Sequence, residues 1–439
     1  MTDGVDSTRH MGGRDPRIAP PSTFSVVEDG AEIRTDVLDN GITVSTQPVP
    51  GARSVSCGVW VRQGAVHEPI EAAGASHMLE HMVFKGTATR SARDLAVAVE
   101  SLGGSLDAFT TREYTAFQAR VLDRHLGTAL DVLQDLTTRP LLRDEDLDLE
   151  REVILEEIAT VEDTPDDVVF DLHAERFWPG HPYGRPILGS RATVASMSGD
   201  TLREIHASRY TGANFIVAAV GNVDHDAFLA GVRERFSEVD EGERAPEIAP
   251  PGEVVRGWDH LERKTAQSHL VFAAPTVPHR HPDRYPLLLL SQALGGGMSS
   301  RLFQRVREEM GLAYSIYAFQ SFYAEAGVSG VYVGTRPASA HVARDTVFEE
   351  LGRLASEGLE PVEFVQVKEQ VRGQLVLALE STAAKLHRLA GYALRDEELR
   401  TMDEILTEID TITQERVAEV ARRYLAPERH YLLTLGPGR

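Results

Sequence analysis

The same order of predicted elements occurs twice in this chain, once on each side of a proline-rich segment. In each half, a strand is followed by helices, then by further strands, then by a long helix. These elements span residues 54–64, 91–104, 114–122 and 124–140 in the first half, and 268–277, 283–310, 313–335 and 339–358 in the second. Such a repeat predicts two homologous lobes of about 200 residues each. We expect an α+β fold, in which helices cover one face of a largely antiparallel sheet in each lobe.

Local signals support the individual elements. Val55, Cys57 and Val59 alternate with other residues, which is typical of a strand. Ser91 followed by Asp94 resembles a capping box and predicts the start of a helix, which the glycines at 103–104 then end. A long helix is predicted from about residue 144 to residue 161 because apolar and charged residues recur there with helical spacing.

Composition shifts set the predicted domain boundaries. Residues 1–28 mix Asp, Arg, Gly and Pro without a period, so we expect a disordered tail there. The N-terminal lobe is predicted over residues 29–237. Acids, prolines and glycines then follow one another without periodicity, which predicts a linker at 238–254. The C-terminal lobe is predicted over residues 255–439.

Charge and cysteine content exclude several classes of protein. The net charge is −22 and no run rich in Lys or Arg occurs, which argues against a nucleic-acid partner. No stretch of about 18 apolar residues exists, so we expect no membrane span. Cys57 is the one cysteine, which excludes an intramolecular disulfide and fits a reducing compartment. We therefore expect a cytoplasmic protein that binds neither nucleic acid nor membranes.

The segment HMLEH at residues 77–81 is the strongest chemical signal in the sequence. His77 and His81 are four apart, so on a helix both imidazoles lie on one face and can reach one ion. Neutral imidazole suits Zn²⁺, and a catalytic zinc takes three protein ligands and a water. Glu80 lies beside that face, where its carboxylate can act as general base toward a zinc-bound water. The order H-x-x-E-H is the inverse of the H-E-x-x-H found in other zinc peptidases.

A third ligand is needed, and the predicted helix at 144–161 offers several acids. They are Glu145, Glu150, Glu152, Glu156 and Glu157. Glu150 and Glu157 are seven apart and lie on one helix face, so one can bind the metal while the other supports a neighbouring ligand. Spacing alone does not choose between Glu156 and Glu157.

From about residue 37 to the C-terminus, the chain resembles the pitrilysin, insulin-degrading enzyme and mitochondrial processing peptidase family of zinc peptidases, the inverzincins. HMLEHMVFKGT resembles the metal helix of this family, LGGSLDAFTTREYTAF its Gly-Gly and Asn-Ala segment, and EREVILEEI its third-ligand helix. Glu157 follows His81 by 76 residues, the spacing in processing-peptidase-like members. The resemblance therefore implies Glu157 as the third ligand and Glu150 as the acid that supports a ligand.

The resemblance also implies residues that contact substrate. The family carries an arginine and a tyrosine seven apart in its second lobe, and GGGMSSRLFQRVREEMGLAYS places Arg307 and Tyr314 at that spacing. Either side chain can donate a hydrogen bond to a developing oxyanion. Asp107 stands where many members have Asn, on an edge strand that pairs with the substrate as an added strand. We expect Asp107 to change substrate preference and to leave the chemistry intact.

The implied function is that of a zinc-dependent endopeptidase with one Zn²⁺ per chain, which cleaves peptides or unfolded segments inside an enclosed chamber. A chain of about this length that carries the metal motif as well as the Arg–Tyr pair resembles half-length members that work as homodimers. Two alternatives stay open. One is a non-catalytic core or partner subunit of the same fold, and the other is a zinc hydrolase acting on small non-peptide amides.

Overall fold

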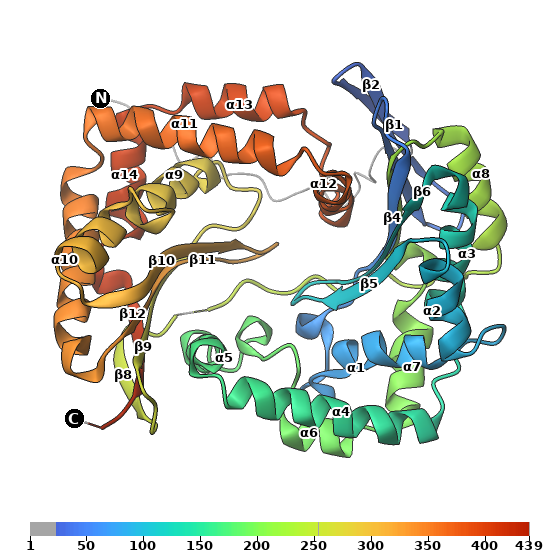
Figure 1. The fold of residues 1–439 in the computed structure, drawn as a ribbon, viewed down its shortest axis with the longest axis horizontal. Helices are drawn as coiled ribbons and strands as arrows, with labels where there is room; N and C mark the ends of the chain where they lie inside the picture. Colours follow the sequence, from blue (N-terminus) through green and yellow to red (C-terminus); the bar gives the residue numbers. More distant parts are fainter. Residues whose placement is uncertain (1–22, 253, 439) are drawn as a thin grey trace, which may run out of the picture.

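The protein consists of two lobes, each built on one β-sheet with a layer of helices on its outer side (Figure 1). The computed structural model describes residues 23–252 and 254–438. Helices and strands are segregated within each lobe, and most neighbouring strands run antiparallel. The predicted α+β fold of two sheet-and-helix lobes is confirmed. None of the described helices is long and apolar enough to cross a membrane.

The N-terminal sheet has seven strands in the order β1-β2-β3-β7-β4-β6-β5. Their bounds are β1 (Thr23–Glu28), β2 (Ala31–Val37), β3 (Thr43–Pro48), β4 (Ser54–Val61), β5 (Ser105–Thr110), β6 (Thr115–Leu122) and β7 (Phe215–Gly221). β3 and β7 run parallel, and the other neighbouring strands run antiparallel. β5 is the last strand, so one edge of this sheet is formed by the segment that carries Asp107.

The C-terminal sheet repeats the order of the last five of these strands. It runs β10-β11-β9-β12-β8, with bounds β8 (Gly257–Glu262), β9 (Ser268–Thr276), β10 (Ala313–Phe322), β11 (Gly327–Thr335) and β12 (Tyr431–Gly436). β8 and β12 are its one parallel pair, as β3 and β7 are in the other lobe. β10 occupies the edge that corresponds to β5. The two lobes therefore share one topology, as the repeated order of elements predicts.

The disordered tail predicted for residues 1–28 includes residues that form a strand. Residues 1–22 lie outside the described part of the chain, but Thr23–Glu28 forms β1 and pairs along its whole length with β2. The side chain of Glu28 is buried and accepts two hydrogen bonds from Arg388, at 2.8 and 3.0 Å. The boundary at residue 28 was wrong: Phe24 and Val26 alternate with the exposed Thr23 and Ser25, but this strand signal is short and directly follows the aperiodic N-terminal segment.

Most of the remaining elements are helices. Those of the first half are α1 (Ala75–Met82), α2 (Ala92–Glu100), α3 (Leu126–Thr138), α4 (Asp144–Glu162), α5 (Pro165–Phe177), α6 (Arg191–Ser196), α7 (Gly199–Arg209) and α8 (His225–Arg235). Those of the second half are α9 (Arg284–Gly295), α10 (Ala340–Glu357), α11 (Pro361–Ala378), α12 (Thr382–Leu394), α13 (Met402–Thr411) and α14 (Gln414–Tyr424). The predicted Ser91 capping box at the start of α2 is present.

Each sheet is covered on its second face by a helix from the other half of the chain (Figure 1). α12 packs on β3, β4 and β7 of the N-terminal sheet, while α5 packs on β9 and β12 of the C-terminal sheet. Leu386 and Leu389 of α12 are buried in one apolar cluster with Trp60 and Ile216. The sequence predicted helices on one face of each sheet only. The order of elements along the chain does not reveal that α5 and α12 each cover the sheet of the other lobe. Burial on both faces explains why every residue of β7 is apolar or glycine.

The predicted linker contains no helix or strand at residues 239–252. It is nevertheless attached to the N-terminal lobe, because Asn214 binds it at two points. Its side-chain oxygen accepts a hydrogen bond from the Ala245 N–H at 2.7 Å, and its side-chain nitrogen donates to the Glu243 carbonyl at 2.8 Å. The connection between the lobes is thus held next to the start of β7.

One predicted helix has an unexpected form. Phe303–Glu309, labelled η7, is a π-helix inside the segment where the sequence predicts an ordinary helix. The wider turn precedes Gly311, whose φ of 59° reverses the chain into β10. Such π-helical turns occur often at functional sites, and Arg307 lies in this one.

Candidate metal centre

The helix α1, which carries HMLEH, is held firmly at its N-terminus. Gly74 precedes it with φ 95°, and a Cβ there would lie 2.6 Å from the Leu188 carbonyl oxygen, so only glycine fits. The buried carboxylate of Glu68 accepts hydrogen bonds from the N–H groups of Gly74 and Ser76, at 2.8 and 2.6 Å. This carboxylate satisfies backbone donors that the first turn of a helix leaves free. No local motif distinguishes Glu68, so its role could not be predicted from sequence.

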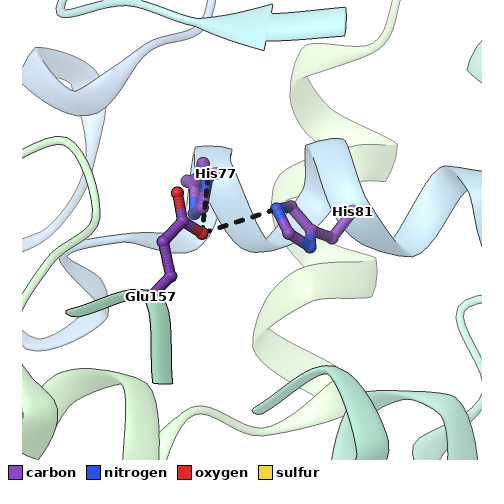
Figure 2. Close-up of side chains that lie close together, drawn as sticks. All are labelled: His77, His81 and Glu157. Atoms are coloured by element: carbon purple, nitrogen blue, oxygen red, sulfur yellow. Dashed lines mark ion pairs between the residues drawn. The ribbon is translucent and has the colours of Figure 1, made fainter. Parts of the chain in front are cut away.

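His77, His81 and Glu157 converge from α1 and α4 (Figure 2). Glu157 Oε2 lies 3.7 Å from His77 Nε2 and 3.9 Å from His81 Nε2. One potential ligand atom of each residue lies within 4.8 Å of the others, and no other such group of three occurs among the described residues. Bonds of zinc length place tetrahedral ligand atoms about 3.4 Å apart. The three side chains therefore need only small movements to surround one ion.

The structure brings Glu157, and not Glu156, to the two histidines. Glu156 is exposed to solvent, and its carbonyl oxygen accepts a hydrogen bond from Thr160 within α4. Helix spacing left Glu156 and Glu157 as alternatives, and the geometry favours Glu157. The face of α4 that carries Glu150 also carries Glu157.

Glu150 orients His81 from behind. Its carboxylate lies 3.0 Å from His81 Nδ1, which leaves Nε2 to face Glu157. The same carboxylate pairs with Lys85, and its side chain is only 6% exposed. A carboxylate on the second ring nitrogen fixes the orientation of a metal-binding imidazole and increases its basicity. Lys85, one turn after His81, was not singled out by the sequence analysis.

The chemistry of the three side chains fits zinc. Burial, helped by the neighbouring His81, lowers the pKa of His77 to about 4, so this imidazole is neutral, as a metal ligand must be. His77 Nδ1 is buried and has no hydrogen-bond partner among the described residues. Two imidazole nitrogens and one carboxylate oxygen form a ligand set that catalytic zinc sites use.

Glu80 lies beside this cluster and is held by the edge strand. Thr110, the last residue of β5, donates a 2.6 Å hydrogen bond to Glu80 Oε2. Burial raises the pKa of Glu80, and the bond from Thr110 opposes that change without cancelling it. Thr110 lies in the segment that resembles the family, but the sequence analysis gave it no role.

Asp107 is placed differently from Thr110. Successive side chains of a strand point to opposite faces, so Asp107 and Phe109 share the face of β5 that is turned away from Glu80. Phe109 on that face contacts the ring of His387 in α12. Asp107 is exposed on the edge strand. It lies on the strand that the sequence analysis expected to pair with substrate.

Arg307 and Tyr314 contact each other on the C-terminal lobe. Arg307 Nη1 donates to the Tyr314 carbonyl oxygen at 3.0 Å, and its guanidinium stacks 4.6 Å from the centre of the Tyr314 ring. The Tyr314 residue is 76% exposed. Among the described residues, no hydrogen bond or ion pair joins this pair to the His77 cluster. The two predicted parts of the site therefore stand on different lobes, each formed from its own neighbours.

Two duplicated α+β lobes, with a His–His–Glu cluster formed by α1 and α4 of the first lobe, are the arrangement of a two-lobed metallopeptidase. Residues 43–191 match the profile of the insulinase family, peptidase family M16, and residues 196–371 match that of the peptidase M16 inactive domain. The chain belongs to the M16 peptidase family. The second match agrees with the geometry, since the described part of the C-terminal lobe holds no metal-binding group of three.

Curated relatives cover nearly the whole chain. An uncharacterized zinc protease of Streptomyces coelicolor is 39% identical over 412 residues, covering 92% of this chain and 90% of the relative. The uncharacterized zinc protease YmxG of Bacillus subtilis is 38% identical over 407 residues, covering 92% and 98%. A protease from Helicobacter pylori has the same fold, with a TM-score of 0.87 at 20% identity over 93% of this chain and all of that one. These comparisons support a zinc peptidase in general terms.

Proposed function

We propose that this protein is a zinc-dependent endopeptidase that cleaves peptides or unfolded polypeptide segments. The observation that carries the proposal is the convergence of His77, His81 and Glu157, with Glu80 one residue from His81 on the same helix. The choice of metal is supported by the relatives, which are named as zinc proteases. One zinc is assigned to each chain, held by these three ligands.

The chain supplies the base and the positions of the reacting groups. Zinc, when bound, polarises the scissile carbonyl and lowers the pKa of water. Thr110 holds one carboxylate oxygen of Glu80, which leaves the other to take a proton from the attacking water and to return it to the leaving amine. Glu150 keeps His81 in the orientation that presents Nε2.

The second lobe supplies donors for the transition state. Arg307 and Tyr314 lie on η7 and β10, at the edge of the C-terminal sheet that corresponds to β5. In this proposal they approach the substrate from the C-terminal lobe and stabilise the tetrahedral intermediate. The substrate pairs with the edge of β5 through main-chain hydrogen bonds, and Asp107 contacts side chains that flank the scissile bond.

We assign a homodimer whose chains enclose a chamber, and a cytoplasmic location. A dimer of identical chains needs no second type of subunit, because one chain carries the metal cluster as well as the Arg307–Tyr314 pair. Support for a reducing location comes from Cys57, which is buried and is the one cysteine. Sedimentation of the zinc-loaded protein tests the dimer directly.

The decisive experiment replaces Glu80 by Gln, which keeps the shape of the side chain and removes its ability to take a proton. We expect normal zinc content and a loss of peptide cleavage by roughly 10²–10⁴-fold, the usual contribution of a general base. Metal analysis and mass spectrometry of a digested peptide mixture supply the two readouts. Glu100→Gln, at an exposed position of α2, is the matched control. Cleavage at the wild-type rate by Glu80→Gln would show the mechanism to be wrong.

The alternative of a non-catalytic subunit makes a different prediction. Such a subunit would cleave none of the peptides even when loaded with zinc. The wild type and Glu80→Gln would therefore give the same result, namely no cleavage, on every peptide of the panel. A zinc hydrolase of small amides would cleave those compounds and leave peptides intact. The same panel, extended with small amides, therefore separates all three functions.

A further inference from the structure

A cavity of 330 Å³ lies where α12 meets the helices of the C-terminal lobe. Its walls come from α9, α11, α12 and α13 and from the end of β10. Most of the lining is apolar or aromatic, and Leu288 and Leu375 are examples. The volume is within the range of small-molecule sites, which are typically apolar with a few polar groups at fixed positions. The cavity shares no lining residue with the metal centre.

The charged groups that line this cavity are all basic. They are Arg284, Arg388 and Arg395, and none of its described lining residues is acidic. The net charge of the whole chain is −22, so a wall of three arginines is unusual for this protein. An electropositive cavity attracts anions and disfavours cations.

The nearby carboxylates do not neutralise these arginines fully. Glu28 pairs with Arg388. Glu397 is shared, since it lies 3.2 Å from His279 Nδ1, 3.2 Å from Arg280 Nε and 3.6 Å from Arg395 Nε. Arg284 forms no ion pair with any described residue. At least one guanidinium at this cavity thus lacks a carboxylate partner within the described chain.

Arg284 and Arg395 line the same cavity, and their like charges repel each other. Burial lowers the pKa of Arg395, and the positive charge of Arg284 contributes to the same shift. The buried Nε of Arg395 has no hydrogen-bond acceptor among the described residues. Arg284 is held in place by bonds to the ring of His279 and to the Tyr285 hydroxyl, which fix the direction of its guanidinium. An anion between these two side chains would relieve the repulsion and supply acceptors.

We propose that this cavity binds a carboxylate carried on an apolar chain. Arg284 and Arg395 bind the carboxylate, and the apolar chain lies against Leu288 and Leu375. Guanidinium groups bind carboxylates through paired, charge-assisted hydrogen bonds. Two sources have this chemistry: a free fatty acid, and the C-terminal residue of a hydrophobic peptide. The proposal does not depend on peptidase activity.

A bound ligand would contact α12, which covers the N-terminal sheet, as well as helices of the C-terminal lobe. α12 packs on the N-terminal sheet, whereas α9 and α11 belong to the C-terminal lobe. The cavity lies between these two groups of helices, so its occupant joins the lobes. Ligand binding should therefore raise the midpoint of thermal unfolding of the whole chain.

Calorimetric titration of the full chain tests the proposal with sodium decanoate as the first probe and decanol as its neutral counterpart. We expect one decanoate per chain and at least tenfold weaker binding of decanol, because charged hydrogen bonds of this kind contribute about 1.5–3 kcal/mol. A second pair of probes, N-acetyl-Leu-Leu as the free acid and as the amide, distinguishes the sources. The tighter-binding acid identifies the class of natural ligand. The proposal is overturned if neither acid binds, or if each acid binds no better than its neutral partner.

Variants locate the site. Arg284→Met and Arg395→Met should each weaken decanoate binding about tenfold or more, while the exposed Arg422→Met on α14 should leave it unchanged. Thermal unfolding checks that each variant is folded. Should either cavity variant fail to fold, the acid-against-neutral comparison on the unaltered protein still decides the question. Equal binding by all three variants would place the ligand elsewhere and contradict the assignment.

Discussion

Thr110 on the edge strand β5 donates a 2.6 Å hydrogen bond to Glu80 on α1. The bond joins the strand at the open edge of the N-terminal sheet to the residue assigned as general base. In the proposed function, a substrate that pairs with β5 is therefore positioned by the same strand that orients Glu80. A change at Thr110 should act on turnover without touching a metal ligand.

Replacement of Thr110 by Val tests this connection. A hydrogen bond to a charged group is typically worth about 1.5–3 kcal/mol, so loss of orientation should lower kcat by roughly tenfold or more. Zinc content should stay at the wild-type level, because Thr110 contacts no ligand. Steady-state kinetics and metal analysis measure the two quantities. Thr407→Val, at an exposed helix position in the other lobe, is the control, and an unchanged kcat in Thr110→Val would contradict the proposed role.

Replacement of Glu150 by Gln should weaken zinc binding. The carboxylate accepts from His81 Nδ1 and pairs with Lys85, and loss of such a supporting group costs roughly 10–100-fold in metal affinity. Titration in metal buffers measures the affinity. Glu152→Gln, on the exposed side of the same helix, should bind zinc normally. Equal affinities of these two variants would rule out a supporting role for Glu150.

The pair Glu156→Gln and Glu157→Gln tests the third ligand. Glu157→Gln should lose stable zinc binding because it leaves two imidazoles as the only protein ligands, whereas catalytic zinc sites use three. Glu156→Gln should keep one zinc per chain, because its side chain is turned to solvent. Zinc content after gel filtration distinguishes the two, and the reverse result would show that α4 presents its other face to the metal.

Glu28 should make stability depend on pH in the acid range. Burial raises its pKa, but the hydrogen bonds from Arg388 and the Met402 N–H outweigh burial and lower it below the ordinary 4.5. A lowered folded-state pKa gives a contribution that is complete above pH 4.5 and is lost as the pH falls through the folded-state value. Glu28→Gln should therefore reduce the free energy of unfolding by roughly 3 kcal/mol at neutral pH.

Urea unfolding from pH 7 downward measures this difference. The difference in unfolding free energy between wild type and Glu28→Gln should stay constant above about pH 5 and should shrink as the pH falls below 4.5. Glu32 is exposed on β2. Glu32→Gln should therefore have the same unfolding free energy as wild type throughout this pH range. A difference that is independent of pH would mean that the carboxylate charge of Glu28 contributes nothing.

The exchange of α5 and α12 predicts that the halves are not independent. A fragment of residues 23–252 lacks Leu386 and Leu389, which cover Trp60 and Ile216. We expect it to aggregate or to bind a hydrophobic dye, and to become soluble when produced together with residues 253–439. Cooperative, dye-free unfolding of the first fragment alone would contradict this expectation.

How far the sequence predicts the structure depends on how local each signal is. The histidines of HMLEH are four apart on one helix, so their common face follows from the geometry of a single helix. Glu157 comes from a helix that is distant in sequence, and its meeting with His77 depends on packing that no local pattern records. The family resemblance nevertheless implied Glu157, whereas Glu68 and Thr110 were missed because no local pattern marks their contacts. Thr110 acts on Glu80, which lies 30 residues away in sequence. Glu68 accepts from N–H groups only six and eight residues further on, at the start of a helix that begins after an intervening turn.

The fold shows the same division. Strand alternation and helix caps predicted elements such as β4 and α2, and the repeated order predicted two alike lobes. The packing of α12 on the opposite lobe could not be predicted, because an apolar helix face does not specify which sheet it covers. The π-helix at η7 was likewise invisible, since its residues have the pattern of an ordinary helix.

The late position of α12 has a consequence for how the protein is made. β7 ends at Gly221, but the helix that covers its second face ends at Leu394. At 5–20 residues per second, the ribosome needs roughly 10–30 s to synthesise the intervening chain. During that interval the face around Trp60 and Ile216 stays open to water and to other nascent chains. The native N-terminal lobe can therefore be completed only after Leu394 has been synthesised.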